Sequence, residues 1–321
     1  MGKTKISWAT HSWNPITGCT KVSSGCAHCY AETMANRFKN LYPDGFGKVT
    51  LHPERLEQPL HWRKPARIFV PSMGDLFHDD VSTYFISAVW EIMERAHWHT
   101  FLVLTKRPER MYRWVDSHKS SGAPMLPNVW LGVSVENQQA ADERIPLLLQ
   151  VPAALHWVSY EPALGPVDLS RWLRRWDCAC EWSVPASALG ANPSGILVCP
   201  GCGASGGLQL SRNPSLGWLV CGGESGKGAR PPHPQWFRDV RDQCVAAGVP
   251  FHFKQWGEYR PIIDEPLPKA TKIAVVSPSG QRIPWYPMTA DDRRSYHAMA
   301  RVGKKAAGSV LDGREHKEYP Q

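Results

Sequence analysis

Residues 18–30 read Gly-Cys-Thr-Lys-Val-Ser-Ser-Gly-Cys-Ala-His-Cys-Tyr and place Cys19, Cys26 and Cys29 on one short loop, spaced Cys-x6-Cys-x2-Cys. Three thiolates can hold three corners of a [4Fe-4S] cluster. Because such clusters normally take four cysteines, one iron would stay open to a small molecule. The same spacing also fits zinc held by the three cysteines with His28 or a distant ligand, or three ordinary buried thiols.

Short apolar runs recur along the chain, and most of them are followed by a helix-like segment. Continuous apolar strands that alternate with helices predict a parallel sheet covered on both faces, so the fold class is α/β. We expect a first strand and its turn into the cysteine loop at 6–19, where Trp13-Asn14-Pro15 should break regular structure. Further strands are expected at 67–71, 100–104, 128–135, 155–160, 216–220 and 249–253. We expect helices at 31–41, 82–96, from 108 onward, at 138–149 with a kink or end near Pro146, and at 234–247 before a capping Gly248.

Polar side chains stand just past the predicted strands. They are Asp75, Lys106, Glu136, Glu161, Glu224 and Lys254. Barrels build their sites at the carboxyl ends of their strands. An open dinucleotide-binding sheet would also place its ligand there, but no Gly-x-Gly-x-x-Gly follows the first strand. We therefore predict a barrel or partial barrel.

A second group of cysteines interrupts the alternation of strands and helices. Cys178-x-Cys180 and Cys199-Pro-Gly-Cys202 lie eighteen residues apart. Two cysteine pairs at this distance indicate a tetrahedral structural zinc site. A second iron–sulfur cluster is the competing interpretation, since Cys-x-Cys is less usual for zinc than Cys-x2-Cys. We interpret the segment as a small zinc-ribbon-like insertion between the fifth and sixth strands.

This pattern divides the chain into four parts. Residues 1–176 form the first part of the barrel with the cysteine loop, and 177–210 form the inserted ribbon. Residues 211–257 complete the barrel, and 258–321 form a C-terminal extension. In that extension, 273–276 and 282–285 predict a hairpin around Ser279-Gly280. The basic run at 303–308 is either an exposed turn or a phosphate contact.

Composition limits the classes of protein. The chain has 321 residues, no apolar run long enough to cross a membrane and no apolar signal core at its N-terminus, so we expect a cytoplasmic protein without a membrane partner. Nine cysteines in such a chain indicate metal binding or reactive thiols rather than disulfides. The net charge of +8, concentrated in the last third, favours an anionic partner such as nucleic acid.

The cysteine loop after a first strand, on a partial barrel with polar strand ends, resembles the radical S-adenosylmethionine (SAM) enzymes. Cys26-x2-Cys29 and the aromatic neighbour Tyr30 match that superfamily's motif. The first gap departs from it, because six residues stand where the usual Cys-x3-Cys-x2-Cys has three.

A more specific resemblance extends over nearly the whole chain. The chain looks like the phage- and prophage-borne three-Cys-motif family of uncharacterised proteins, which are distant relatives of radical SAM enzymes. The motifs that carry this resemblance are W-N-P-I-T-G-C at 13–19, S-V-E-N-Q at 134–138, S-Y-E-P at 159–162, G-G-E-S-G at 222–226, F-K-Q-W-G at 253–257, and G-K-K-A-A-G with L-D-G-R at 303–314.

The superfamily resemblance implies a cofactor pair. Cys19, Cys26 and Cys29 would bind a [4Fe-4S] cluster whose open iron chelates SAM. One electron would then cleave SAM to a 5′-deoxyadenosyl radical that abstracts a substrate hydrogen. An external electron donor is implied as a partner.

The resemblance also implies which residues contact SAM. Gly74 and Asp75 would meet its amino group, Ser134 and Glu136 its ribose or carboxylate, and Gly222, Gly223 and Glu224 its adenine end; Tyr30 and Glu161 complete the expected set. The alternative for the carboxylates of Asp75, Glu136 and Glu161 is that they form ordinary ion pairs with Lys106, Arg107 or Lys254.

We expect an enzyme that modifies or repairs DNA or a nucleotide by radical chemistry, similar in type to the branch that repairs the spore photoproduct. A radical enzyme acting on a peptide or small metabolite is the rival of the same class. The rival of another class is a non-catalytic iron–sulfur and zinc protein that binds nucleic acid. A fourth cluster ligand, such as His28 or Cys221, would favour that rival.

Overall fold

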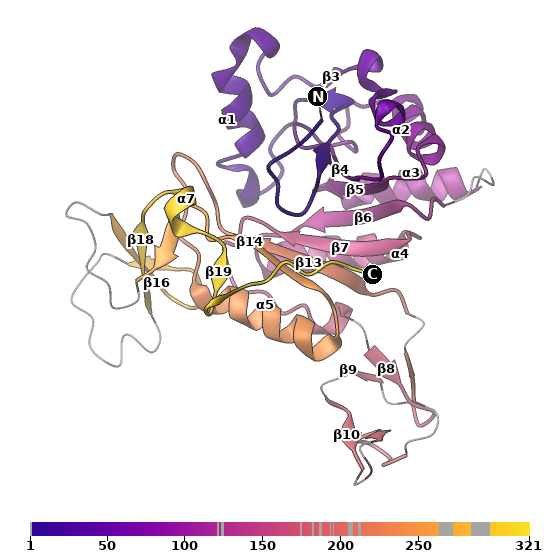
Figure 1. The fold of residues 1–321 in the computed structure, drawn as a ribbon, viewed down its shortest axis with the longest axis vertical. Coiled ribbons are helices and arrows are strands. Elements are labelled where there is room, and N and C mark those ends of the chain that lie inside the picture. The colour runs from indigo at the N-terminus through magenta and orange to yellow at the C-terminus, as the bar shows by residue number, and fades with distance from the viewer. Residues whose placement is uncertain are drawn as a thin grey trace.

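A seven-stranded parallel sheet forms the body of the molecule. The computed structural model describes residues 2–120, 122, 125–173, 175–181, 183–185, 188–192, 194, 196–204, 208–210, 213–262, 272–283 and 296–321. The strands stand in chain order across the sheet: β1 (His11–Ser12), β4 (Arg67–Val70), β5 (Thr100–Thr105), β6 (Val129–Ser134), β7 (Leu155–Tyr160), β13 (Leu216–Gly222) and β14 (Phe251–Gln255). The sheet curls into a half-barrel (Figure 1), which confirms the predicted α/β partial barrel.

Helices cover the outer face of the curled sheet. They are α2 (Thr83–Arg95), α3 (Pro108–Ser120), α4 (Gln138–Gln150) and α5 (Pro234–Ala247). Side-chain caps begin two of them: Ser82 Oγ accepts a hydrogen bond from the Phe85 N–H at the start of α2, and Asn137 Oδ1 accepts one from Ala140 at the start of α4. Gly248 ends α5 in the left-handed conformation, with φ 64°, as predicted.

The inner face of the half-barrel is filled with aromatic side chains at its lower end. Strand residues alternate, so Phe101 and Val103 pack toward the helices while Leu102 packs inward. Trp157 and Trp218 join Leu102 on the inner face, and Trp8 from the N-terminal segment packs against both. Val220 and Leu104, nearer the carboxyl ends of their strands, extend this inner cluster.

Three local elements can be compared with their expected bounds. The first strand is only two residues long, because Trp13-Asn14-Pro15 turns the chain away from the sheet. The helix expected at 31–41 is α1 (Tyr30–Arg37), followed by a 3₁₀ turn at Lys39–Leu41. Helix α4 matches the helix expected at 138–149 and does not end at Pro146, since Ile145 and Leu148 on either side of the proline are buried in the core.

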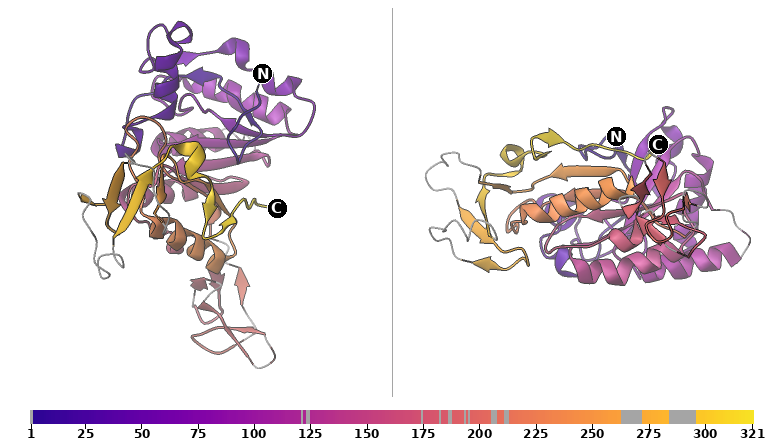
Figure 2. Two further views of the ribbon diagram at one scale, coloured as in Figure 1. Left: turned by 60° about the vertical axis from the view of Figure 1, so that its left-hand side comes forward. Right: turned by 90° about the horizontal axis from the view of Figure 1, so that it is seen from below.

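The inserted segment projects away from the sheet (Figures 1 and 2). It contains a three-stranded sheet of β8 (Arg175–Asp177), β9 (Ser183–Pro185) and β12 (Gln209–Leu210), and a hairpin of β10 (Gly190–Ala191) and β11 (Leu197–Val198). A 3₁₀ turn at Ser170–Trp172 leads into it.

The C-terminal extension forms its own antiparallel sheet beside the barrel. Its strands are β15 (Tyr259–Pro261), β18 (His297–Arg301), β16 (Ile273–Val276) and β17 (Arg282–Ile283). Val275 pairs with Ile283, as the predicted hairpin requires, while Pro284 and Trp285 lie outside the described residues. The basic run forms a short helix, α7 (Lys304–Ala307), before β19 (Val310–Leu311) and β20 (Arg314–Glu315).

No helix among the described residues is both long and apolar enough to cross a membrane.

Gly132 tests the packing of the inner face. An added Cβ would stand 2.5 Å from the Trp157 ring, so Gly132→Ala should destabilise the fold by about 1–3 kcal/mol through overpacking. Thermal unfolding should report this as a lower midpoint. Gly47→Ala is the matched control, because its Cβ would meet nothing within 4 Å. Equal midpoints for the two variants would contradict the packing described here.

Candidate functional site

The cysteine loop, residues 18–30, crosses the carboxyl edge of the sheet. It follows β2 (Ile16–Thr17), which pairs with β3 (Thr50–Leu51), and it ends where α1 begins. Gly18 forms a parallel bridge with Gly74 just past β4, and its N–H donates to Met73 O at 2.9 Å. Gly18 has φ +89°, and a Cβ there would stand 2.0 Å from the Lys48 carbonyl oxygen. Only glycine therefore lets the loop start so close to the strand ends.

Asn14 fastens the same region from the preceding turn. Its Oδ1 accepts hydrogen bonds from the backbone N–H groups of Ser72 and Met73, at 2.8 and 2.9 Å. The turn Trp13-Asn14-Pro15 thus supports the loop that carries Gly74. We did not predict this role, although Trp-Asn-Pro stood out as a break in regular structure.

The three loop cysteines are free and partly exposed. Cys19 and Cys29 pack against the small cluster of Ala31, Ala35 and Phe46. In the part of the chain that the structure describes, only the four insert cysteines form a group whose ligand atoms all lie within 4.8 Å of one another. The three loop cysteines do not form such a group. Each cysteine of a cubane cluster ligates a different iron, so three thiols on one loop offer three of the ligands that such a cluster takes.

A buried arginine connects Cys19 with the second and third strand ends. Arg107 Nη1 lies 3.4 Å from Cys19 Sγ and 3.6 Å from Asp75 Oδ2. Burial raises the pKa of the Cys19 thiol to about 11, and the Asp75 charge adds to this, while Arg107 opposes both. Arg107 is thus the side chain that favours the thiolate form of Cys19.

Asp75 is fully engaged by protein donors. Its Oδ1 accepts from Thr105 Oγ1 at 2.7 Å and from Phe77 N at 3.0 Å, and its Oδ2 accepts from Lys106 N at 3.1 Å. With Arg107 alongside, the carboxylate joins the loops after β4 and β5. Asp75 thus forms an ion pair with Arg107, which is the alternative to a SAM contact considered from the sequence.

Glu136 occupies the end of the fourth strand and supports the middle of the loop. Its Oε2 accepts from Arg144 Nη1 at 2.9 Å, and its Oε1 lies 3.4 Å from the Gly25 N–H. Burial raises the pKa of Glu136, but the Ser23 hydroxyl and the Arg144 guanidinium outweigh it and lower the pKa overall. Arg144 also donates to the Ser134 carbonyl oxygen at 2.7 Å. Glu136 therefore pairs with an arginine from α4, not with Lys106, Arg107 or Lys254.

A third arginine–carboxylate pair reaches the loop from the sixth strand. Glu224 accepts from the Arg230 backbone N–H and Nε at 2.8 Å each. Arg230 Nη2 also donates to the Ser24 carbonyl oxygen at 3.0 Å. A Cβ at Gly228 would stand 2.8 Å from the His28 ring, so this segment lies directly against the loop.

The remaining predicted rim residues lie at the ends of the fourth to seventh strands of the sheet. Glu161 Oε1 pairs with Lys254 Nζ at 3.1 Å, as the ion-pair alternative expected. Gly222 lies beside it, since a Cβ there would stand 2.5 Å from Glu161 Oε1. At Gly223 there is likewise no room for a side chain, because an added Cβ would stand 1.9 Å from the Trp256 carbonyl oxygen. Ser134 is buried at the end of β6.

Tyr30 was expected to contact SAM, and Cys221 was considered as a fourth cluster ligand. Tyr30 opens α1 and is 61% exposed. Cys221 is fully buried in the core cluster between sheet and helices. The idea that Cys221 supplies a fourth cluster ligand is therefore wrong, because its side chain faces the helices and not the cysteine loop.

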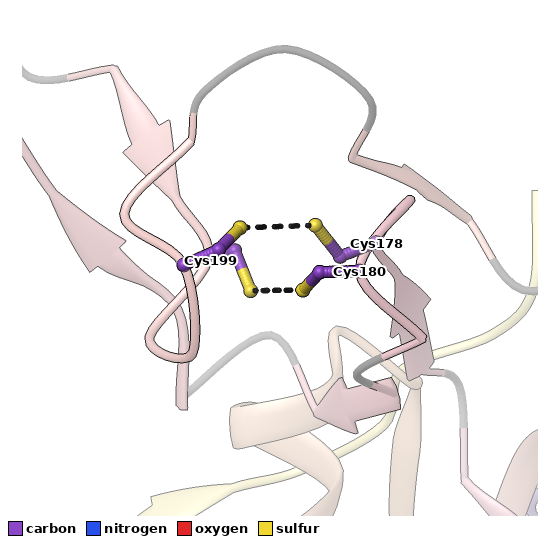
Figure 3. Close-up of side chains that lie close together, drawn as sticks. Cys178, Cys180 and Cys199 are labelled. Carbon is purple, nitrogen blue, oxygen red and sulfur yellow. Dashed lines mark hydrogen bonds between the residues drawn. The ribbon is translucent and has the colours of Figure 1, made fainter.

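The insert holds the second group of cysteines. Cys178 Sγ lies 3.7 Å from Cys202 Sγ, and Cys180 Sγ lies 3.6 Å from Cys199 Sγ. Figure 3 shows the two cysteine turns facing each other with their sulfurs directed inward. Hydrogen bonds from the backbone N–H of Cys202, and from that of Gly201, lower the pKa of Cys199 to about 7 against the effect of burial. These four cysteines form a group that could hold a metal ion.

A family model described as "Protein of unknown function (DUF5131)" matches residues 3–320. The match agrees with the expected membership of an uncharacterised family. No curated protein matches the sequence.

Solved structures of spore photoproduct lyase align with part of the chain. A lyase complexed with dinucleoside spore photoproduct is 13% identical with a TM-score of 0.34, and a single-substitution mutant is 14% identical with a TM-score of 0.37. Each alignment covers 50% of this chain and 47% of the lyase. The chain thus spans about half the length of the lyase, whose activity and substrate do not transfer through so distant a likeness.

Glu136→Gln tests the support of the loop. The variant leaves the Arg144 guanidinium buried without its counter-charge, so we expect a loss of about 3 kcal/mol of stability, near the lower end for breaking a buried pair because the amide oxygen still accepts a hydrogen bond. Thermal unfolding measures the loss. Glu109→Gln, which breaks the exposed pair with Arg113, should cost less than about 1 kcal/mol.

The stability difference between the wild type and Glu136→Gln should also depend on pH. The folded-state pKa of Glu136 is lowered, so its contribution is present above the unfolded-state pKa of about 4.3 and is lost as the pH falls through the folded-state value. The stability gap between the wild type and Glu136→Gln should therefore narrow in acid. A gap that does not change with pH would contradict a charged Glu136–Arg144 pair.

Proposed function

The chain belongs to the DUF5131 family of proteins of unknown function, and from its cysteine loop we propose that it is a radical SAM enzyme with a [4Fe-4S] cluster on Cys19, Cys26 and Cys29. One observation carries the proposal. Three free, partly exposed cysteines lie on a loop that three buried or half-buried arginine–carboxylate pairs hold at the carboxyl edge of a half-barrel. Barrels place their chemistry at this edge.

The three-cysteine set leaves one iron for a small molecule. When bound, such a cluster supplies the electron that splits the sulfonium bond of SAM into methionine and a 5′-deoxyadenosyl radical. Cys221 is buried on the helix side, which supports an open iron. We propose that the chain's own residues position the cofactor and that the cluster supplies the redox chemistry.

The contacts described above refine which atoms would hold SAM. The carboxylates of Asp75, Glu136 and Glu224 are engaged by protein donors, so we assign them to support of the loop. The backbone of Gly74, the Ser134 hydroxyl and the backbone groups of Gly222 and Gly223 stay in the proposed cofactor set. Glu161, paired with Lys254, and the exposed Tyr30 complete it.

We further propose DNA or a nucleotide as the substrate. The support is the net charge of +8, which favours association with phosphate-bearing molecules. A peptide or small metabolite substrate, and a cluster protein that binds nucleic acid without turnover, are the rival outcomes.

We propose in addition that Cys178, Cys180, Cys199 and Cys202 bind zinc. Tetrahedral coordination with Zn–S bonds of about 2.3 Å places neighbouring sulfurs about 3.8 Å apart. The observed separations of 3.7 and 3.6 Å match this spacing. The described residues of the insert belong to none of the apolar core clusters, so an ion that fastens its two cysteine turns would have a structural role.

The cluster proposal is tested by anaerobic reconstitution with iron and sulfide, followed by dithionite reduction and electron paramagnetic resonance. We expect a [4Fe-4S]⁺ signal that shifts when SAM is added, with formation of 5′-deoxyadenosine. Replacing Cys19, Cys26 or Cys29 with serine should abolish the signal. Cys244→Ala, which removes a buried thiol outside both groups, should keep the signal.

Three outcomes separate the alternatives. A signal that ignores SAM indicates a structural or redox cluster, and a wild-type chain without iron overturns the proposal. If SAM is cleaved, oligonucleotides or nucleotides should raise the yield of 5′-deoxyadenosine. Stimulation by peptides alone would contradict the proposed substrate class.

Zinc is tested by metal analysis of the purified chain. We expect about one zinc per chain, and Cys199→Ser should lose it because three thiolates and a hydroxyl bind zinc more weakly than four thiolates. The iron content after reconstitution should stay unchanged in this variant. Iron in place of zinc, or full zinc in Cys199→Ser, would contradict the assignment.

A further inference from the structure

One of the three loop thiols meets a fixed cation. Arg107 follows β5, and its side chain is 9% exposed. Its Nη1 lies 3.4 Å from Cys19 Sγ, while its Nη2 donates to the Thr20 hydroxyl at 2.8 Å and to the Thr20 carbonyl oxygen at 3.2 Å. The guanidinium fork thus grips the residue next to Cys19 and directs an N–H group at the sulfur.

Asp75 and Thr105 hold the arginine in this position. Asp75 Oδ2 lies 3.6 Å from Arg107 Nη1. Thr105 Oγ1 accepts a hydrogen bond from the Arg107 backbone N–H at 2.9 Å and donates to Asp75 Oδ1 at 2.7 Å. Thr105 therefore holds the backbone of Arg107 and Asp75 holds its guanidinium, and the two side chains are bonded to each other. The fold thus sets the distance between Arg107 and Cys19.

The contact distinguishes Cys19 from the other two cysteines. Among the described residues, no charged side chain donates a hydrogen bond to Cys26 or Cys29. Arg107 would thus act on a bound cluster mainly through the iron that Cys19 ligates. The site is partly shielded from water, so the guanidinium charge acts there more strongly than it would on the surface.

We propose that Arg107 raises the reduction potential of the cluster through its hydrogen bond to Cys19, an inference that rests on the proposed function. Reduction adds one electron, and the added negative charge spreads onto the thiolate sulfurs. A cationic N–H donor stabilises that charge more in the reduced than in the oxidised state. Hydrogen bonds to ligand sulfurs are one of the ways in which proteins set the potentials of iron–sulfur clusters.

The test is a redox titration of the reconstituted holoprotein, followed by electron paramagnetic resonance. In Arg107→Gln the cationic donor is gone, and we expect the reduced form to be disfavoured about threefold to tenfold. This corresponds to a midpoint roughly 30 to 60 mV more negative, since tenfold is about 59 mV for one electron. Arg113→Gln removes an equal charge from the exposed face of α3 and should leave the midpoint unchanged.

Iron and sulfide content are measured alongside, so that a damaged cluster is not mistaken for a shifted one. If Arg107→Gln assembles no cluster, Arg107→Lys replaces it. Lysine keeps the charge but cannot grip Thr20 and Cys19 together, so a smaller negative shift is expected. A midpoint equal to that of the wild type in the variant that assembles overturns the inference.

The two proposals fail in different ways. A wild-type chain that assembles no cluster overturns the proposed function and this inference with it. A cluster that responds to SAM, but whose potential ignores Arg107, overturns only the inference.

Discussion

Three arginine–carboxylate pairs at the carboxyl edge of the sheet hold the cysteine loop in place. Arg107 with Asp75, Arg144 with Glu136 and Arg230 with Glu224 stand behind the third, fourth and sixth strands of the sheet. Together they reach Cys19 and Thr20, Gly25, and Ser24. Apart from Cys19 and Cys29, which pack against the Ala31, Ala35 and Phe46 cluster, the loop is held by these polar contacts. Charges buried in pairs are costly to break, which makes the arrangement specific.

The carboxylates at the strand ends fall into two groups by their partners. Asp75, Glu136 and Glu224 accept hydrogen bonds from protein donors and fix the loop, whereas Glu161 pairs with Lys254 and packs against Gly222. The inner face below them is closed by Trp157 and Trp218. A ligand at the carboxyl edge would therefore meet polar groups above an aromatic floor. Such a site can exclude water around a reactive species while a few donors orient it.

Much of this architecture follows from local sequence patterns. Apolar runs ending in Asp75, Glu136 and Glu224 predict strand ends at one edge, and Cys-x-Cys with Cys-Pro-Gly-Cys predicts a four-thiol group in the insert. The partners of the carboxylates are harder to predict. Arg144 lies on the outer helix α4, and Arg230 follows a loop after β13, so only the folded chain shows that both turn back to the rim. The sequence predicts the break at Trp13-Asn14-Pro15 but not the partner of Asn14, whose side chain bonds to the loop after the next strand.

Mössbauer spectroscopy of the ⁵⁷Fe-reconstituted protein, with and without SAM, tests the central claim most directly. If Cys19, Cys26 and Cys29 hold a [4Fe-4S] cluster with one open iron, SAM should change the isomer shift of one iron site and leave the other three unchanged. Four iron sites that do not respond to SAM, or a protein that takes up no iron at this loop, would contradict the claim.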